Sequence, residues 1–124
     1  MPFQMTTFSL PSGARCARID WRGLATGPEG DQVTAAAEPG GSTYGIPCLV
    51  LSYELTGVDL EARRIFSSKR MDGIQTKMAM VVSNPLIRVA VNFIMRVRRN
   101  GLQRVFTSEA EAIRWLDQSA GQGG

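Results

Sequence analysis

A short apolar run followed by a long apolar helix is the dominant pattern of hydrophobic and polar positions in this chain. Residues 78–83 are apolar except for the last, and such a run predicts a strand covered on both faces. Asn84 and Pro85 come next, and they suit an N-cap and the first helical position respectively. The Asn-Gly pair at 100–101 is a left-handed stop signal. We therefore predict a strand over 78–83 and a helix over 85–99.

The predicted helix has more apolar surface than one sheet face can cover. Nine of the residues from 86 to 97 are apolar, whereas a surface helix needs an apolar arc of about 100°. The flank that includes Val91 and Met95 can be core, a dimer contact, the wall of a ligand groove or a membrane-contacting surface. Because two-fold dimers are the commonest assembly, we predict a homodimer, or a larger symmetric assembly, in which this helix contributes to the contact.

Arginines occupy the polar side of the same helix. Arg88, Arg96 and Arg99 form a ridge of one sign, without carboxylates at the i+4 positions to neutralise them. The ridge is either a docking surface for an acidic partner or the solvated face that keeps an apolar helix in water. The solvated face is the default interpretation, and the docking surface stays open as the functional alternative.

The rest of the chain alternates between strands and helices. The strands are predicted at 3–10, 14–21, 46–55, 78–83 and 103–106. The helices are predicted at 58–71, 85–99 and 109–118, and a loop with a short helical turn is predicted at 32–38. This order predicts a single α/β domain over 1–118, with a mixed, mostly parallel sheet of four or five strands packed by helices. A disordered polar tail is expected over 119–124.

Three segments, 26–29, 56–59 and 108–111, have the spacing of a capping box. In this motif a Ser or Thr side chain accepts a hydrogen bond from the N–H three residues later, and the residue there reaches back. We expect each segment to begin a helix.

The composition removes several classes of function. The 124 residues contain no histidine and two cysteines, Cys16 and Cys48, and the net charge is +3. Without histidine, Ser-His-Asp and Cys-His catalytic sites are excluded, and two thiols alone cannot complete a zinc site. The positive charge is sparser than the basic stripe of a nucleic-acid binder. We therefore predict no enzyme activity, no metal, no cofactor and no nucleic-acid partner.

The sequence also indicates in which cellular compartment the protein is expected. No basic region followed by an apolar run begins the chain, so we expect a cytoplasmic protein with both cysteines reduced. A helix of roughly 15 residues is too short to span a bilayer, which takes about 20. Contact with a membrane surface is the one membrane role left open.

A family resemblance comes from the last third of the chain. The run at 78–86 and a closing pattern resemble the SpoIIAA-like branch of the STAS fold, a STAS/CRAL-TRIO-like family of sulfate transporters and anti-sigma-factor antagonists. The closing pattern consists of Phe106, Thr107, Glu109, Glu111, Ala112, Trp115 and Leu116. The resemblance implies an α/β sandwich that acts as a non-enzymatic protein-interaction module, regulatory in character. Lipid-like ligands in distant relatives imply an alternative, a carrier of an apolar small molecule or lipid beside helix 85–99.

The resemblance also singles out Thr56. In the anti-sigma-factor antagonists, the phosphorylated serine belongs to an Asp-Ser-Ser-Gly motif before a helix, and the matching segment here is Glu-Leu-Thr-Gly at 54–57. Thr56 is therefore a candidate phosphoacceptor, although the residues around it differ from the family motif. The alternative is that its hydroxyl only caps helix 58–71 by accepting from the N–H of Asp59, and the recurrence of capping-box spacing favours this.

Overall fold

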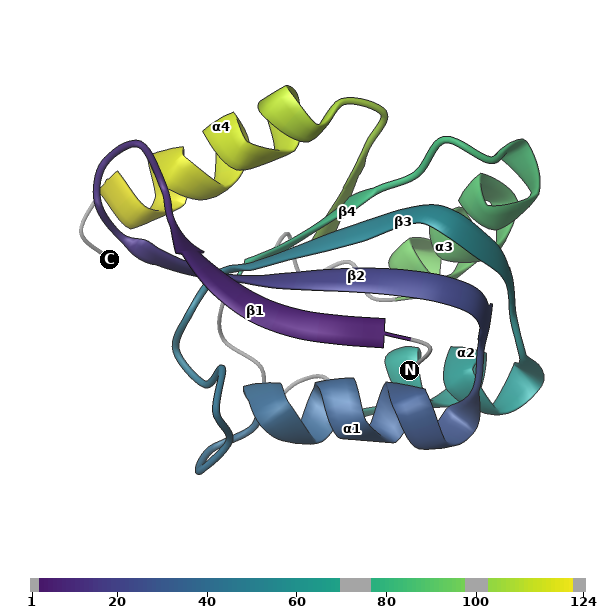
Figure 1. The fold of residues 1–124 in the computed structure, drawn as a ribbon. Helices are drawn as coiled ribbons and strands as arrows, with labels where there is room; N and C mark the ends of the chain where they lie inside the picture. Colours follow the sequence, from purple (N-terminus) through teal and green to yellow (C-terminus); the bar gives the residue numbers. More distant parts are fainter. Residues whose placement is uncertain (1–2, 70–76, 98–102, 122–124) are drawn as a thin grey trace.

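The computed structural model describes residues 3–69, 77–97 and 103–121 (Figure 1). The strands are β1 (Phe3–Ser9), β2 (Arg15–Ala25), β3 (Cys48–Val58), β4 (Met78–Val81) and β5 (Gln103–Phe106). The helices are α1 (Gly27–Ala37), α2 (Leu60–Phe66), α3 (Pro85–Val97) and α4 (Glu109–Gly121). The order of the elements along the chain is the alternation that the sequence predicts.

The strands form one five-stranded sheet in the order β1-β2-β3-β4-β5. β1 and β2 pair antiparallel as a hairpin, and the other three pairs are parallel. Each parallel pair is joined through a helix, since a short turn cannot connect parallel strands. The predicted α/β fold, with a mixed and mostly parallel sheet, is confirmed.

Helices cover both faces of the sheet (Figure 1). α1, α2 and α3 pack on one face, where Ile19 and Ile87 are among the buried core residues. α4 packs on the other face, where Leu49 and Leu116 are buried. Residues 48–52 of β3 are buried and β4 has no exposed residue, so both segments are covered on both sides, which explains their continuous apolar runs.

Helix α1 is longer than the sequence predicts. It begins at Gly27, five residues before the short helical turn expected at 32–38. The capping residues were identified correctly, because the N–H of Thr26 donates to Glu29 Oε1 at 3.0 Å. Glycine at the first helical position, Gly27, allows the close approach of α2, because a Cβ there would overlap the side chain of Glu61. A Cβ at Gly30 would lie 3.5 Å from Phe66, which is an ordinary contact distance.

The other helix boundaries are partly as predicted. Asn84 Oδ1 accepts from the N–H of Leu86 at 2.8 Å, and Ser108 Oγ accepts from the N–H of Glu111 at 3.4 Å, so both predicted N-caps are confirmed. Helix α2 spans 60–66, inside the predicted 58–71. Helix α4 continues to Gly121, three residues beyond the predicted end at 118. The predicted stop at 100–101 and the tail residues 122–124 lie outside the described residues.

Candidate functional site

The carboxyl ends of three parallel strands lie together at one edge of the sheet. β2, β3 and β4 end at Ala25, Val58 and Val81, and the chain then leads into α1, α2 and α3. Figure 1 shows these connections on the right of the view. In open parallel sheets this edge is the usual location of a binding site, because the connections present their side chains there.

Four large apolar side chains at this edge are exposed. Leu24 near the end of β2 is 50% exposed, and Leu60 in the first turn of α2 is 63% exposed. Leu86 and Val89 at the start of α3 are 77% and 70% exposed. We call these four residues the apolar edge. Residues of this kind are ordinarily buried, and each of the four lies in or shortly after one of the strands that end at this edge.

Thr56 lies beside the apolar edge, but it does not cap a helix. β3 continues through Val58, and the N-cap of α2 is Asp59, whose Oδ1 accepts from the N–H of Ala62 at 2.8 Å. The predicted cap at Thr56 is therefore wrong, because pairing with β2 keeps the chain extended beyond this residue. Thr56 occupies an irregularity in that pairing, between positions matched with Gly23 and Leu24. Its side chain is exposed.

Helix α3 turns Val91 to the core. Val91 is 2% exposed and packs in the core with Ile87, whereas Leu86 and Val89 point into solvent. Of the alternatives left open for the flank with Val91 and Met95, core is therefore the one that holds for Val91, which is not available to bind a partner.

The polar residues Arg88, Asn92 and Arg96 mark the outer side of the helix, but the apolar arc opposite them is wide, so the sequence does not say which of its residues lie deepest. Only the packing against β3 decides it.

The arginine ridge is described only in part. Arg88 is exposed. The backbone of Met95 and Arg96 belongs to α3, but their side chains lie outside the described part of the structure, and Arg99 lies wholly outside it. The docking surface formed by these three arginines therefore stays a prediction.

A shallow polar depression beside Arg88 was not predicted. Arg88 and Asn92 of α3 line it together with Arg104 of β5 and Glu111 of α4. Arg104 also lies over the Phe106 ring, with 5.7 Å between the guanidinium carbon and the ring centre. No local sequence pattern links Arg88 with Arg104, since the two meet only because α3 packs beside β5.

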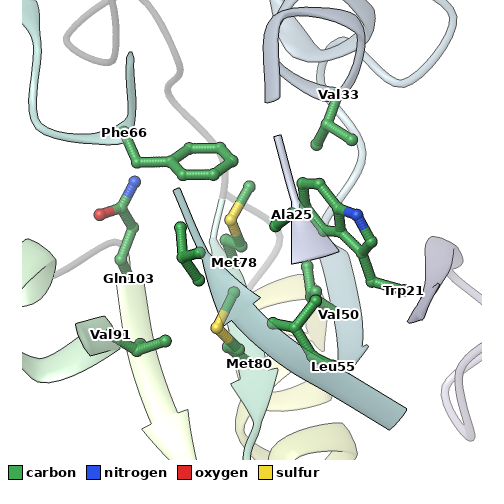
Figure 2. A pocket seen from close by; sticks show the side chains of 11 residues that line it. Trp21, Ala25, Val33, Val50, Leu55, Phe66, Met78, Met80, Val91 and Gln103 are labelled. Atoms are coloured by element: carbon green, nitrogen blue, oxygen red, sulfur yellow. The ribbon is translucent and has the colours of Figure 1, made fainter. Parts of the chain in front are cut away.

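An apolar cavity of about 30 Å³ lies between the sheet and helices α1, α2 and α3 (Figure 2). Trp21, Phe66, Met80 and Val91 are among its lining residues. Gln103 also lines the cavity, and its buried Oε1 has no hydrogen-bond partner among the described residues. Such an orphaned oxygen is unusual, because leaving a buried acceptor unpaired costs about 1–3 kcal/mol.

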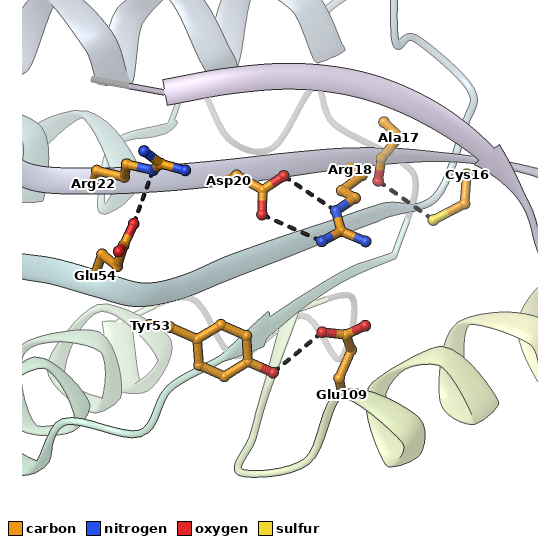
Figure 3. Close-up of polar contacts among 8 residues, drawn as sticks. All are labelled: Cys16, Ala17, Arg18, Asp20, Arg22, Tyr53, Glu54 and Glu109. Atoms are coloured by element: carbon orange, nitrogen blue, oxygen red, sulfur yellow. Dashed lines mark hydrogen bonds and ion pairs between the residues drawn. The ribbon is translucent and has the colours of Figure 1, made fainter. Parts of the chain in front are cut away.

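The face of the sheet that carries α4 has a row of polar contacts along β2 and β3 (Figure 3). Arg18 pairs with Asp20 at 3.1 Å, and Arg22 pairs with Glu54 at 2.8 Å. Exposed ion pairs of this kind add little stability.

One further contact on this face joins the sheet to α4. The hydroxyl of Tyr53 donates to Glu109 Oε1 at 3.2 Å. Burial, and then the negative charge of Glu109, raise the pKa of Tyr53. This contact positions the first turn of α4 and places no nucleophile beside a base.

Among residues 3–69, 77–97 and 103–121, no three His, Cys, Asp or Glu side chains come close enough to hold a metal ion. None of the described helices is long and apolar enough to cross a membrane.

Comparison with known proteins identifies the family of the chain. Residues 41–120 match the family described as "Domain of unknown function (DUF7793)". The chain belongs to this family. No curated protein matches this DUF7793 chain.

Two solved structures resemble the DUF7793 chain. An uncharacterized protein of the DUF3478 family with a SpoIIAA-like fold, from Shewanella loihica PV-4, has a TM-score of 0.62 and 18% identity, over 92% of this chain and 93% of that chain. The anti-sigma factor antagonist SpoIIAA in its unphosphorylated form has a TM-score of 0.58 and 15% identity, over 96% of this chain and 98% of that chain. At these identities the similarity establishes the fold, and the predicted SpoIIAA-like STAS fold is confirmed.

Proposed function

We propose that this DUF7793 domain is a non-enzymatic, regulatory module that recognises a protein partner through the apolar edge. The observation that carries the proposal is the exposure of Leu24, Leu60, Leu86 and Val89 around three strand ends. Grouped apolar side chains on a soluble protein usually mark an interaction site. Each one that passes from water into an interface gains roughly 1.5–3 kcal/mol before the entropy of association is subtracted.

The chemistry of the chain favours binding over catalysis. There is no histidine to act as a general base at neutral pH. Cys16 and Cys48 are buried, and burial raises the pKa of each thiol to about 12. Neither thiol is therefore ionised at neutral pH, which a cysteine nucleophile requires.

Thr56 offers a way to regulate such an interaction. Its exposed hydroxyl lies next to the strand positions of Leu24 and Gly57, at the border of the apolar edge. A phosphate there would add a charge of roughly −1.5 to −2. That charge would have to lose its water when a partner covers the apolar edge, so phosphorylation at Thr56 would weaken docking.

Quantitative affinity capture from cells that make the protein tests this function. The tagged wild type is compared with the double variant Leu60→Glu/Leu86→Glu, which places two charges in the apolar edge. Tyr44→Glu is the matched control, because Tyr44 is 49% exposed but precedes β3, at the opposite end of the sheet. We expect at least one protein to bind the wild type and the Tyr44→Glu control but not the double variant.

The interaction must then be reproduced with that partner in purified form. Equal binding of the partner to the wild type and to Leu60→Glu/Leu86→Glu would exclude the apolar edge. A Thr56→Glu variant that binds as tightly as the wild type would exclude the regulatory role of Thr56 while leaving the docking surface intact.

A carrier of a small apolar molecule is the second candidate. It is favoured by the apolar cavity and by Gln103 Oε1, which has no hydrogen-bond partner in the described part of the chain. At about 10–15 Å³ for each water centre, a cavity of about 30 Å³ holds about two waters and no lipid. The carrier function therefore requires the cavity to widen. Native mass spectrometry of gently purified protein distinguishes the two functions, because a co-purifying small mass supports only the carrier.

A further inference from the structure

β1 forms an open edge of the sheet. Its seven residues pair one-for-one with β2, from Phe3 opposite Trp21 to Ser9 opposite Arg15, with no irregularity. β1 is the outermost strand on this side, at the front of Figure 1. The backbone N–H and C=O groups that point away from β2 therefore have no partner among the described strands, and they form a ready template for another strand.

This edge lacks the features that normally prevent pairing between chains. Proteins protect exposed edges with charged side chains, proline, bulges or very short strands. β1 reads Phe-Gln-Met-Thr-Thr-Phe-Ser and contains no charge, proline or glycine. The first charged residue of the whole chain is Arg15, in β2. The other edge differs, since β5 has only four residues and carries the charged Arg104.

We infer that β1 pairs antiparallel with β1 of a second copy of this chain, which joins the two sheets across a two-fold axis. An antiparallel edge is self-complementary, because each residue meets its partner reciprocally under two-fold symmetry. An axis at Thr6 sets Thr6 opposite its own copy, Gln4 opposite Phe8 and Met5 opposite Thr7. β1 itself contributes no charged side chain to this arrangement. The guanidinium of Arg15 in β2 donates to Thr7 Oγ1 at 3.2 Å within the same copy.

The side chains of β1 are better suited to pairing with a second β1 strand than to exposure to solvent. Met5 and Phe8 are only half-buried, and they border the cores on opposite faces of the sheet. Added strands would continue both faces and cover these side chains further. Thr6 and Thr7 at the centre are exposed, and paired threonines on neighbouring strands stabilise a sheet.

Charge disfavours helix α3 as the contact between two copies of the chain. Arg88 is exposed beside Leu86 and Val89. A two-fold contact through these residues would bring the positively charged Arg88 side chains of the two copies close together. β1 presents no such repulsion. The inference is independent of the proposed function, because the apolar edge and β1 belong to different parts of the molecule.

Analytical ultracentrifugation of the full chain over a concentration series tests this inference with a charge-swap pair. We expect the wild type to shift from monomer to dimer with concentration. Thr6→Lys alone and Thr6→Glu alone should each remain monomeric, because two like charges then meet near the axis. An equimolar mixture of the two variants should recover the doubled mass, which loss of folding cannot produce. Gln32→Lys, on exposed α1, is the control for added charge and should behave as the wild type does.

Two results would overturn the inference. One is a wild type that stays monomeric at every concentration. The other is a dimer that survives in both Thr6 variants. If that surviving dimer dissociates in Leu86→Glu, the contact lies on α3, as the hydrophobic pattern of the helix alone would predict.

Discussion

Asp59 and Ala62 form the hydrogen bond that begins helix α2, with 2.8 Å between Asp59 Oδ1 and the backbone nitrogen of Ala62. This contact leaves the hydroxyl of Thr56 out of the helix cap. It therefore separates two roles that the sequence assigned to one residue. Asp59 supports the fold, whereas Thr56 is exposed on the strand before it.

Substitution of these two residues should have unequal effects. Asp59→Ala should lower the free energy of unfolding by about 0.5–2 kcal/mol, the usual effect of removing an N-cap. Asp59→Asn should retain most of the stability, because asparagine caps as well as aspartate. Thr56→Ala should change it by no more than about 0.5 kcal/mol, as at other exposed positions. Urea denaturation measures all three, and a larger loss from Thr56→Ala than from Asp59→Ala would contradict this assignment.

Two valines of α3 provide a test of the face it turns to the core. Val91 is 2% exposed and Val89 is 70% exposed. Val91→Ala should lower the free energy of unfolding by about 1.5–3 kcal/mol through lost burial and the cavity left behind. Val89→Ala should stay within about 0.5 kcal/mol of the wild type. Equal losses measured by chemical denaturation would mean that the helix is rotated from the orientation described.

Gly30 should be a position where alanine stabilises the protein. A Cβ there would lie 3.5 Å from Phe66 and 3.7 Å from Ala62, which is ordinary packing distance. Alanine favours the helix over glycine by about 0.8–1.0 kcal/mol, so Gly30→Ala should raise the thermal midpoint. Gly30→Leu should lower it, since the larger side chain must displace α2. A lower midpoint for Gly30→Ala would show that α1 and α2 pack more tightly than the structure indicates.

The buried cysteines predict a loss of stability in alkaline solution. Burial raises the pKa of Cys16 and Cys48 from 9.0 to about 12 in the folded protein. Above pH 9 the unfolded chain releases these protons while the folded chain retains them, so the free energy of unfolding falls from about pH 9 towards pH 12. The slope of stability against pH should be smaller in Cys16→Ala/Cys48→Ala. If the slope is unchanged in this double variant, groups other than the two cysteines cause the loss of stability at alkaline pH.

Labelling with a thiol reagent is an independent test of the burial of Cys16 and Cys48. Both groups should be protected from a thiol reagent in the native protein at pH 8, because a buried neutral thiol is a poor nucleophile. Both should react once the chain is unfolded in denaturant without any reductant. Rapid labelling of the native protein would contradict the buried environment of these residues.

The local parts of this fold could be predicted from the sequence. The N-caps at Asn84 and Ser108 depend on groups only two or three residues apart, so the pattern of residue types was sufficient. Strand β5 has the predicted bounds. The continuous apolar runs correctly indicated strands covered on both faces, and the alternation of strands with helices indicated the mostly parallel sheet.

Only the tertiary structure decided where the candidate site lies. Thr56 and Asp59 are both favourable N-cap residues by type, and pairing of β3 with β2 chose between them by keeping the chain extended to Val58. Likewise, the apolar residues of α3 surround most of the helix, and packing against the sheet chose Val91 for the core and left Val89 in solvent. Strand pairing and burial join residues that are distant in the chain, so no local pattern contains the information that places them.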